Sequence, residues 1–396
     1  MKTIVMSANE YCNYITDGTH DSPKPKDSGY RLITSKHLGR YELDFESANY
    51  ISKEDYLKVI ARSAVEQWDI LFSMIGTIGN TYIETNANIE YACKNMGIFK
   101  LNGDVGKAKW LYYYLQSPKA REYIITSSRG TTQGYVPLGA LRSFPIEVPD
   151  DNTVRDKISD FLWNLDEKIK INQRINDNLL QQAQAVFMHI FGDNVSVTVA
   201  TIADIAINVT DGVHNTVKDD PEGQYLLLSC KNIKGGILSI GTSERRINAE
   251  TFEKLRRRTK LAKGDILISS VGTVGELLLL NTDPSNYEFQ RSVAIVKPNL
   301  EIVSSAYVYE SLVTKKAELI NAAHGAVQQC LFISDIAGFP IGIPEPTDLR
   351  SFNEVVNPMF DTITVNEDEN LRLEALRDTL LPKLMSGELD VSEVDF

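Results

Sequence analysis

The sequence is poor in the closely spaced ligands that build zinc sites. Its four cysteines, Cys12, Cys93, Cys230 and Cys330, lie far apart and form no CxxC pair. None of its five histidines belongs to an HxxxH-type pair that could seat a metal. The sequence therefore predicts four free thiols and no structural zinc.

Long apolar runs are also missing. No segment approaches the length needed to span a bilayer, and the start of the chain lacks the charged region, apolar run and cleavage site of a secretory leader. The chain is therefore expected to be a soluble, cytoplasmic protein. With 396 residues and 43% hydrophobic content, it is expected to form two domains with separate cores.

Positive charge is in deficit. The formal net charge is -12 at pH 7, and phosphate binding needs lysine and arginine, so the composition argues mildly against nucleic acid as a partner. The argument applies to the whole chain, and a local basic surface can override it.

What the sequence does contain is a long internal repeat. Four blocks recur in one order at offsets of 194 to 196 residues, so the chain is interpreted as a tandem duplication. The matched blocks are DGTH at Asp17 and DGVH at Asp211, YRLITSKHL at Tyr30 and YLLLSCKNI at Tyr225, DILFSMIGTIGN at Asp69 and DILISSVGTVGE at Asp265, and GTTQGYVPLGALRSFPIEVP at Gly130 and GAVQQCLFISDIAGFPIGIP at Gly325.

Each half is expected to begin with a mixed, mostly β domain. YRLIT, DILFSMIG and FPIEVP are rich in β-forming residues and bounded by Gly, Pro, Asn and Asp, whereas KWLYYYLQSPKAREYI and AYVYESLVTKKAELI are helical patterns. The predicted fold class is α/β of the α+β kind, with domains at residues 1–150 and 195–345.

Each half then ends in a predicted long helix, at residues 151–194 and 346–396. Apolar residues recur every seven positions with a companion row four residues further along, which is typical of a coiled coil. Two asparagines interrupt the stripe of each helix, and because such residues fix register, we expect two antiparallel helices with their asparagines together at mid-seam. The residues predicted to pair the helices are Leu165, Asn172, Asn176 and Leu179 in the first and Met359, Asn366, Asn370 and Leu373 in the second.

Pro358 departs from the repeat. It lacks a backbone donor and clashes with the preceding turn, so a kink or a fresh helix start is expected there. A helix of roughly 35 to 40 residues is on the order of 55 Å long, which suits a spacer between the domains.

The chain resembles the DNA-specificity subunits of type I restriction-modification systems. The resemblance is carried by WDILFSMIGTIGN and GDILISSVGTVGE, by GTTQGYVPLGALRSFPIEVP, and above all by the ending LRDTLLPKLMSGELDV, and it covers nearly the whole chain. It implies that each half carries one target-recognition domain for one part of a split, asymmetric site in double-stranded DNA. It also implies that the long helices set the number of unread base pairs between the parts.

The resemblance further implies partners that carry the chemistry. Two methyltransferase subunits would dock on the helical region, and restriction or translocase subunits would join the complex. S-adenosylmethionine, ATP and Mg would belong to those partners, so this chain is expected to need no cofactor and not to be an enzyme. Its sequence contains neither a P-loop pattern nor a methyltransferase NPPY-type motif.

The main basic run is KLRRRTKLAK at Lys254–Lys263, with six basic side chains and no acid in ten residues. It predicts a phosphate-tracking surface in the second domain, with an ordinary solvated surface as the alternative. The corresponding region of the first domain has only Lys53, Lys58 and Arg62, so the domains are expected to hold DNA unequally.

Other candidates come from the repeated turns and loops. The glycines of GTIG and GTVG permit close approach of the backbone to phosphate, or simply a tight turn. Residues 131–133 and 326–328 share a frame yet differ between the halves, and Gln and Arg suit base edges. The predicted DNA-binding residues are His20, Lys36, Arg62, Thr77, Arg129, Thr131, Thr132 and Gln133 in the first half, and His214, Lys231, Arg256, Arg257, Arg258, Lys260, Thr273, Arg291, Gln328 and Gln329 in the second.

The repeated Asp-Gly-x-His has three interpretations. It is a structural turn in which Asp caps backbone amides and Gly takes a positive φ, a DNA contact by His20 and His214, or a catalytic dyad. For the whole chain, the alternatives to DNA recognition are a duplicated non-DNA scaffold, for glycans for example, that dimerises through its helices, and a hydrolase built on these turns.

Overall fold

The chain divides into two compact units, each holding one domain and part of both long helices. The first unit is Met1–Lys170 with Leu371–Phe396, and the second is Ile171–Asn370. The computed structural model describes residues 2–129, 134–192, 198–214, 217–241, 244–325 and 329–389.

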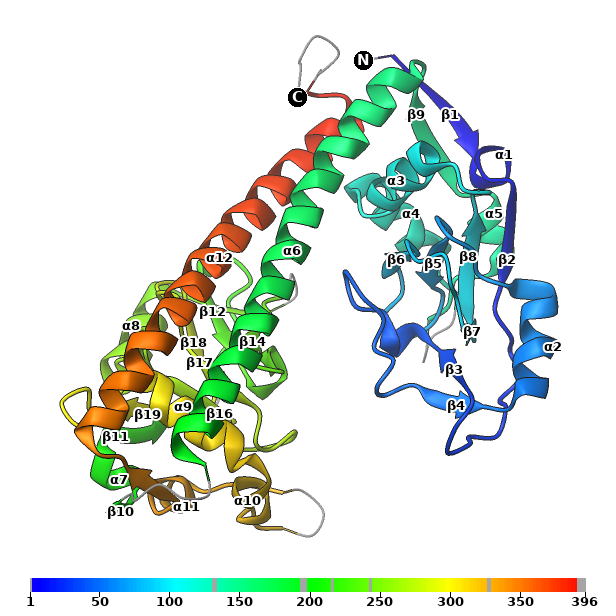
Figure 1. The fold of residues 1–396 in the computed structure, drawn as a ribbon. Helices are drawn as coiled ribbons and strands as arrows, with labels where there is room; N and C mark the ends of the chain where they lie inside the picture. Colours follow the sequence, from blue (N-terminus) through cyan, green and yellow to red (C-terminus); the bar gives the residue numbers. More distant parts are fainter. Residues whose placement is uncertain are drawn as a thin grey trace. The chain divides into compact units, whose positions relative to one another are not determined.

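The first domain is built on two small sheets and a closing strand pair (Figure 1). The four-stranded antiparallel sheet has the order β2-β8-β5-β6, and the three-stranded sheet has the order β4-β3-β7, in which β3 and β7 are parallel. β1 and β9 form the closing pair. The strands are β1 (Thr3–Ser7), β2 (Tyr14–Asp17), β3 (Tyr30–Ile33), β4 (Asn49–Ile51), β5 (Ile70–Ser73), β6 (Thr81–Ile83), β7 (Tyr91–Cys93), β8 (Met96–Lys100) and β9 (Pro145–Pro149). The helices are α1 (Ala8–Tyr11), η1 (Ser35–His37), α2 (Lys53–Ser63), α3 (Val105–Tyr114), α4 (Pro118–Ser127) and α5 (Leu138–Arg142).

The second domain repeats this topology and adds the two-stranded hairpin β13-β14. Its sheets have the orders β11-β19-β16-β17 and β15-β12-β18, with β12 and β18 parallel, and β10 and β20 form the closing pair. The match confirms the predicted tandem duplication. The strands are β10 (Thr198–Thr201), β11 (Ala206–Asp211), β12 (Tyr225–Leu228), β13 (Ile233–Lys234), β14 (Ile237–Leu238), β15 (Arg245–Ile247), β16 (Ile266–Ser269), β17 (Leu277–Leu279), β18 (Tyr287–Phe289), β19 (Val293–Pro298) and β20 (Pro340–Ile343). The helices are α7 (Ile202–Ile205), η2 (Cys230–Asn232), α8 (Ala249–Thr259), α9 (Ser305–Thr314), α10 (Lys316–Asn321) and α11 (Ile333–Ala337).

Strands β5 and β16 are apolar on both faces because each separates two cores. Ile70 and Phe72 of β5 enter the core around Trp110, whereas Leu71 between them enters the core around Tyr91. The alternate residues of β16 divide in the same way. Since successive side chains of a strand point to opposite faces, both segments appear in the sequence as continuous apolar runs.

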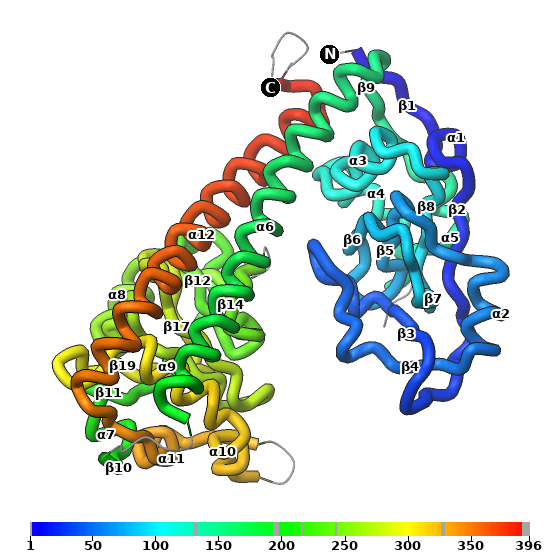
Figure 2. The backbone as a smooth tube through the Cα atoms, viewed as in Figure 1, coloured from blue at the N-terminus to red at the C-terminus, as the bar shows by residue number. Residues whose placement is uncertain are grey.

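Both long helices are continuous and run antiparallel, as predicted. α6 spans Asn152–Phe191 and α12 spans Pro346–Ser386. In the second unit, Figure 2 shows the orange part of α12 beside the green part of α6, and the rings of Phe187 and Phe352 pack 5.9 Å apart. The fresh helix start expected at Pro358 is wrong. This proline lies on the exposed side of α12, where water can satisfy the carbonyl that loses its donor.

The predicted asparagine pairing is confirmed, and it lies wholly within the second unit. Asn172 Nδ2 donates to Asn370 Oδ1 at 2.9 Å and to Glu369 Oε2 at 2.8 Å. Asn366 Nδ2 donates to Asn176 Oδ1 at 2.8 Å. The other predicted pairing residues are half-buried beside this seam: Leu165, Leu179, Met359 and Leu373.

The seam of the first unit contains a buried ion pair that the heptad pattern did not predict. Arg377 of α12 lies 2.5 Å from Asp166 of α6, and the two residues are 1% and 2% exposed. The hydroxyls of Tyr41 and Tyr113 also donate to Asp166, at 2.9 and 2.8 Å. At the repeat offset of 194, the corresponding positions of the second unit carry apolar residues, Phe360 and Ala183, both buried.

All four cysteines are free thiols. No helix in the described ranges is both long enough and apolar enough to cross a membrane. In the same ranges, no group of three His, Cys, Asp or Glu residues is placed to hold a metal ion.

Candidate nucleic-acid interface

In the second domain, strand ends from both sheets meet at one edge. β11 ends beside the start of β19, where Asp211 pairs with Ala294, and β16 ends there too. β12 and β18 are parallel and end at the same edge. The linker Gln290–Ser292 passes from β18 into β19 and so crosses between the two sheets at the centre of this edge.

Backbone hydrogen bonds collect the neighbouring loops around this linker. The Arg291 amide donates to Val213 O at 3.0 Å, and the Gln290 amide donates to Leu228 O at 2.8 Å. The Leu331 amide donates to Ser270 O at 2.9 Å, which brings the segment after residue 328 beside the GTVG turn. We call this surface the second rim; it consists of Val213, His214, Cys230, Lys231, Thr273, Gln290, Arg291, Gln329 and Cys330.

The first domain forms an equivalent edge with the same hydrogen bonds. The Asn95 amide donates to Thr19 O at 3.1 Å, and the Lys94 amide donates to Ile33 O at 2.9 Å. Ile75, just before the GTIG turn, forms a bridge with Tyr135. We call this surface the first rim; it consists of Thr19, His20, Ser35, Lys36, Thr77, Lys94, Asn95, Arg129 and Tyr135.

The two rims share a backbone frame but differ in side chains. Lys94 and Asn95 of the first rim occupy the places of Gln290 and Arg291 in the second. The sequence prediction missed three of these four, because the linker blocks CKNM and FQRS share no residue. The DILFS and DILIS blocks, which precede these linkers in the chain, align at an offset of 196. The same offset pairs Lys94 with Gln290 and Asn95 with Arg291, and it was the signal that could have identified these residues.

The Asp-Gly-x-His turn of the first domain is held by an arginine of α2. Asp17 Oδ2 lies 2.9 Å from His20 Nε2, and Arg62 donates to the carbonyls of Asp17 and Gly18 at 3.1 and 2.8 Å. The positive φ expected at Gly18 is wrong. The position requires glycine for space, because a Cβ there would overlap the Cys93 carbonyl.

The second domain repeats the same arrangement with Arg258 of α8. Its guanidinium donates to the carbonyls of Asp211 and Gly212, and His214 Nε2 lies 2.6 Å from Asp211 Oδ2. Gly212 also lacks a positive φ, and a Cβ there would overlap the Phe289 carbonyl. Arg258 therefore holds a turn at the edge of the second rim, as Arg62 does in the first.

The geometry gives the Asp-His pair of the first domain no catalytic arrangement. In the first domain, His20 Nδ1 lies 2.9 Å from Asn95 Oδ1, while Nε2 is beside Asp17. With both ring nitrogens engaged, the imidazole has no free nitrogen to take a proton from a nucleophile.

The basic run of α8 separates into structural and exposed side chains. The Arg256 guanidinium pairs with Glu288, which is 0% exposed, and also donates to Tyr287 O at 2.9 Å. Burial raises the pKa of the Glu288 carboxyl, and Arg256 offsets part of that shift. Arg256 thus stabilises the domain, a role the sequence did not predict. The exposed basic side chains of the run, in addition to Arg258, are Lys254, Arg257, Lys260 and Lys263.

Most of the other predicted DNA-binding residues gather at the rims. The first rim contains His20, Lys36, Thr77 and Arg129, and the second contains His214, Lys231, Thr273, Arg291 and Gln329. Lys231 is already paired with Glu244 at 3.0 Å. Four further predictions lie outside the described residues: Thr131, Thr132, Gln133 and Gln328.

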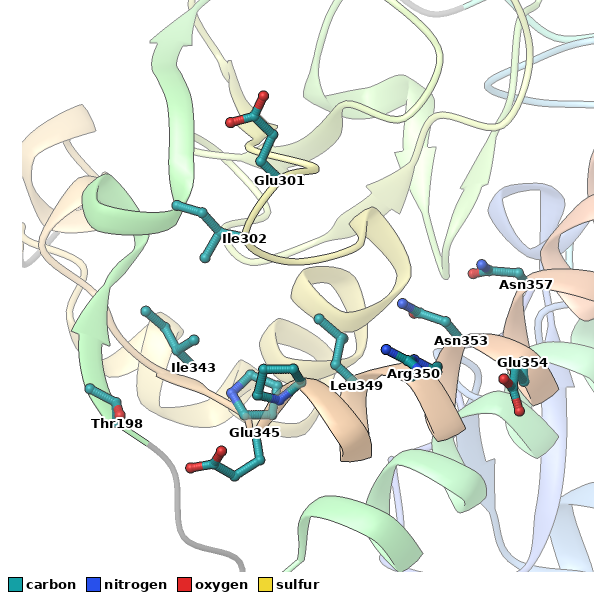
Figure 3. Close-up of a pocket in the computed structure, with 12 residues that line it drawn as sticks. Thr198, Glu301, Ile302, Ile343, Glu345, Leu349, Arg350, Asn353, Glu354 and Asn357 are labelled. Atoms are coloured by element: carbon teal, nitrogen blue, oxygen red, sulfur yellow. The ribbon is translucent and has the colours of Figure 1, made fainter.

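An open groove of the second unit lies elsewhere, at the start of α12 (Figure 3). Its volume is about 670 Å³, and Ile302, Ile343 and Leu349 supply its apolar lining. The charged residues of its lining are three glutamates and one arginine: Glu301, Glu345, Glu354 and Arg350. This excess of carboxylates disfavours the binding of phosphate.

The chain is similar to type I specificity subunits over most of its length. The family model of the type I restriction modification DNA specificity domain matches residues 22–181. The chain is 26% identical to the type I restriction enzyme MjaIX specificity subunit of Methanocaldococcus jannaschii, over 91% of this chain and 87% of that protein. It is 23% identical to the type I restriction enzyme HindI specificity subunit of Haemophilus influenzae, over 83% and 88% of the two chains. A solved type I restriction-modification S subunit from M. genitalium has the same fold, with a TM-score of 0.52 at 15% identity, over 97% of this chain and 96% of that one.

Proposed function

This chain belongs to the DNA specificity subunits of type I restriction-modification systems, and from that premise we propose that it reads a bipartite, asymmetric DNA site with its two rims. Each rim takes one half-motif. The observation that carries the proposal is the repeated backbone frame with unlike side chains, Lys94 and Asn95 in one domain against Gln290 and Arg291 in the other. Two identical readers would give a palindrome, whereas two unlike readers in one frame suit two different half-motifs.

The side chains at the rims suit base edges in the major groove. Arginine makes paired hydrogen bonds to guanine, asparagine and glutamine make them to adenine, and lysine and threonine add further contacts. The exposed cations of the basic run at residues 254–263 suit the phosphate backbone, which contributes affinity without sequence information. In that role we keep Lys254, Arg257, Lys260 and Lys263 and leave out Arg256, whose charge is already compensated by Glu288.

The long helices suit the roles of spacer and docking platform. We propose that they hold the rims at a set distance, which fixes the gap between half-motifs, and that two methyltransferase subunits dock along them, with restriction or translocase subunits added. S-adenosylmethionine, ATP and Mg then act in those partners, and this chain contributes recognition without catalysis. The cytoplasm, where the chromosome is accessible, is the proposed location.

No specific observation favours the competing hypotheses. A non-DNA scaffold would explain the helices, but it would not explain why the two rims share a backbone frame and differ in their side chains. A hydrolase built on the turn of the first domain would need a free ring nitrogen on His20, and both nitrogens of that ring are engaged.

The test is selection from randomised duplex DNA by the full chain assembled with its methyltransferase subunits, at several salt concentrations. We expect two conserved half-motifs that differ in sequence, separated by a gap of fixed length, with affinity falling as salt rises. Enrichment of one uninterrupted motif, or of none, would overturn the proposal. The methyltransferase subunits alone, on the same library, are the control.

A further inference from the structure

The linker at the centre of each rim carries one residue at an equivalent backbone position, Asn95 in the first domain and Arg291 in the second. We propose that Arg291 reads a guanine in the half-motif of the second domain, and that Asn95, its counterpart, reads an adenine in the half-motif of the first. The inference rests on the proposed function, and it assigns to each domain one base of the site.

Both residues occupy the same backbone position. The amide of each donates to the residue after the repeated Asp-Gly, Thr19 O at 3.1 Å for Asn95 and Val213 O at 3.0 Å for Arg291. The residue before each donates to the end of the parallel strand, β3 or β12. Because the backbone is fixed twice over in each domain, the side chains leave the rim from equivalent points.

The side chain of Arg291 is available for a ligand. The residue is exposed, and no ion pair or side-chain hydrogen bond engages its guanidinium in the part of the chain that the structure describes. The contrast with Arg256 and Arg258, which both bind groups of their own domain, separates it from the structural arginines.

The surroundings of Arg291 favour a base over a phosphate. The residues that the backbone and hydrogen bonds place next to it are uncharged, namely Gln290, Val213 and Ser270. Lys231 of the second rim is paired with Glu244. A phosphate site gathers several cations, whereas a base-reading surface combines one arginine with amides and hydroxyls. Arginine suits guanine because its two parallel N–H groups match the O6 and N7 acceptors of that base.

The side chain of Asn95 is oriented by its neighbours and suits hydrogen bonding to adenine. It is half-buried, with a φ of 55°, and its Oδ1 lies 2.9 Å from His20 Nδ1, so the amide is fixed by a second residue of the first rim. An asparagine amide offers one donor and one acceptor, which match N7 and N6 of adenine. His20 is in this assignment a positioning residue for Asn95.

The test is the same duplex selection, carried out with R291K and R291A in the full chain assembled with its methyltransferase subunits. R291K keeps the charge and loses the paired donors. Both variants should lose preference for guanine at one position of one half-motif, by roughly 5- to 150-fold at that base pair, with the other half-motif unchanged. N95D should lose one adenine in the opposite half-motif.

The matched control is R257A, which removes an exposed arginine of the same domain from α8. It should weaken binding to all duplexes about equally and leave every base of the motif unchanged. An R291K motif identical to that of the unmodified chain, or a uniform loss of affinity in R291A without a change of motif, overturns the inference while leaving the proposed function intact. An unmodified chain that selects no bipartite motif overturns both, and unchanged thermal unfolding of the variants verifies that the rim has kept its fold.

Discussion

At the residue scale, the duplication serves as an internal control, because each position has a counterpart in a nearly equal environment. Arg62 and Arg258 hold the same turn in the two domains, so an exposed arginine at the edge of the rim is structural in both. Among the described residues the Arg291 guanidinium has no such partner, and its counterpart, Asn95, is not an arginine. The two domains thus distinguish arginines that hold a turn from the one at the centre of the second rim.

Glu310 of α9 gives a prediction of pH-dependent stability. It is 1% exposed, neither carboxylate oxygen has a hydrogen-bond partner among the described residues, and burial raises its pKa to about 8. The folded state therefore keeps a proton that the unfolded state releases above its ordinary pKa of about 4.5. Stability from this group is present below that ordinary pKa and falls as the pH rises toward 8, by up to about 1.4 kcal/mol per pH unit.

We expect E310Q to remove this dependence. Measured by urea unfolding, the variant should gain roughly 1 to 3 kcal/mol relative to the unmodified chain between pH 5 and pH 8. E318Q, at an exposed glutamate of the neighbouring α10, should show no such trend. Stability curves for E310Q and the unmodified chain that run parallel over this range would contradict the assigned burial of the charge.

At the scale of elements, the contact between α6 and α12 is polar at one position of the first unit and apolar at the corresponding position of the second. The first unit buries Asp166 with Arg377, whereas the second buries Phe360 with Ala183 at the corresponding positions. The seam is therefore not self-complementary. If α6 paired with a second copy of itself, Asp166 would lie beside Ala183 and lose its counter-charge. The ion pair therefore favours the pairing of α6 with α12 over the pairing of α6 with another α6.

This difference predicts what happens when the apolar pair of the second unit replaces the ion pair of the first. R377A leaves Asp166 buried without its partner and should lower the free energy of unfolding by about 3 to 5 kcal/mol. The double change D166F with R377A copies the apolar pair of the second unit and should recover part of that loss, because buried ion pairs are often replaceable by apolar groups. The recovery is incomplete because the hydroxyls of Tyr41 and Tyr113 lose their acceptor. Urea unfolding measures both, with R372A on the exposed side of α12 as the control. A double variant no more stable than R377A would show that the seams are not interchangeable.

At the scale of the whole molecule, the helices give a prediction about the DNA site. Because α6 and α12 are paired, an insertion must be made in both, for example seven residues after Asn176 and seven before Asn366, so that the asparagine contacts can reform in register. Seven residues lengthen a helix by about 10 Å, or roughly three base pairs. We expect duplex selection to give unchanged half-motifs with a gap longer by about that amount. Altered half-motifs with an unchanged gap would mean that the helices do not set the spacing.

The sequence predicted those parts of the structure that leave a repeated or periodic pattern in it. The repeated blocks gave the duplication, and the asparagines gave the register of the helices, since both depend on residues close together along the chain or at a fixed offset. The pairing of Arg256 with Glu288, of Arg62 with the Asp17 turn, and of Asp166 with Arg377 joins residues that only the tertiary fold brings together. Gly18 was recognised as special for a wrong reason, because the carbonyl it must avoid belongs to a distant strand.

The last helix completes the first domain. Leu381, Leu384 and Met385 of α12 belong to the same core as Trp110 and Leu162. The ribosome makes these residues long after the first domain has emerged, and at roughly 5 to 20 residues per second the delay is on the order of 10 to 40 s. We expect that half-finished core to stay open to chaperones until α12 has been made. A product that stops before α12 would then lack part of the core of its first domain.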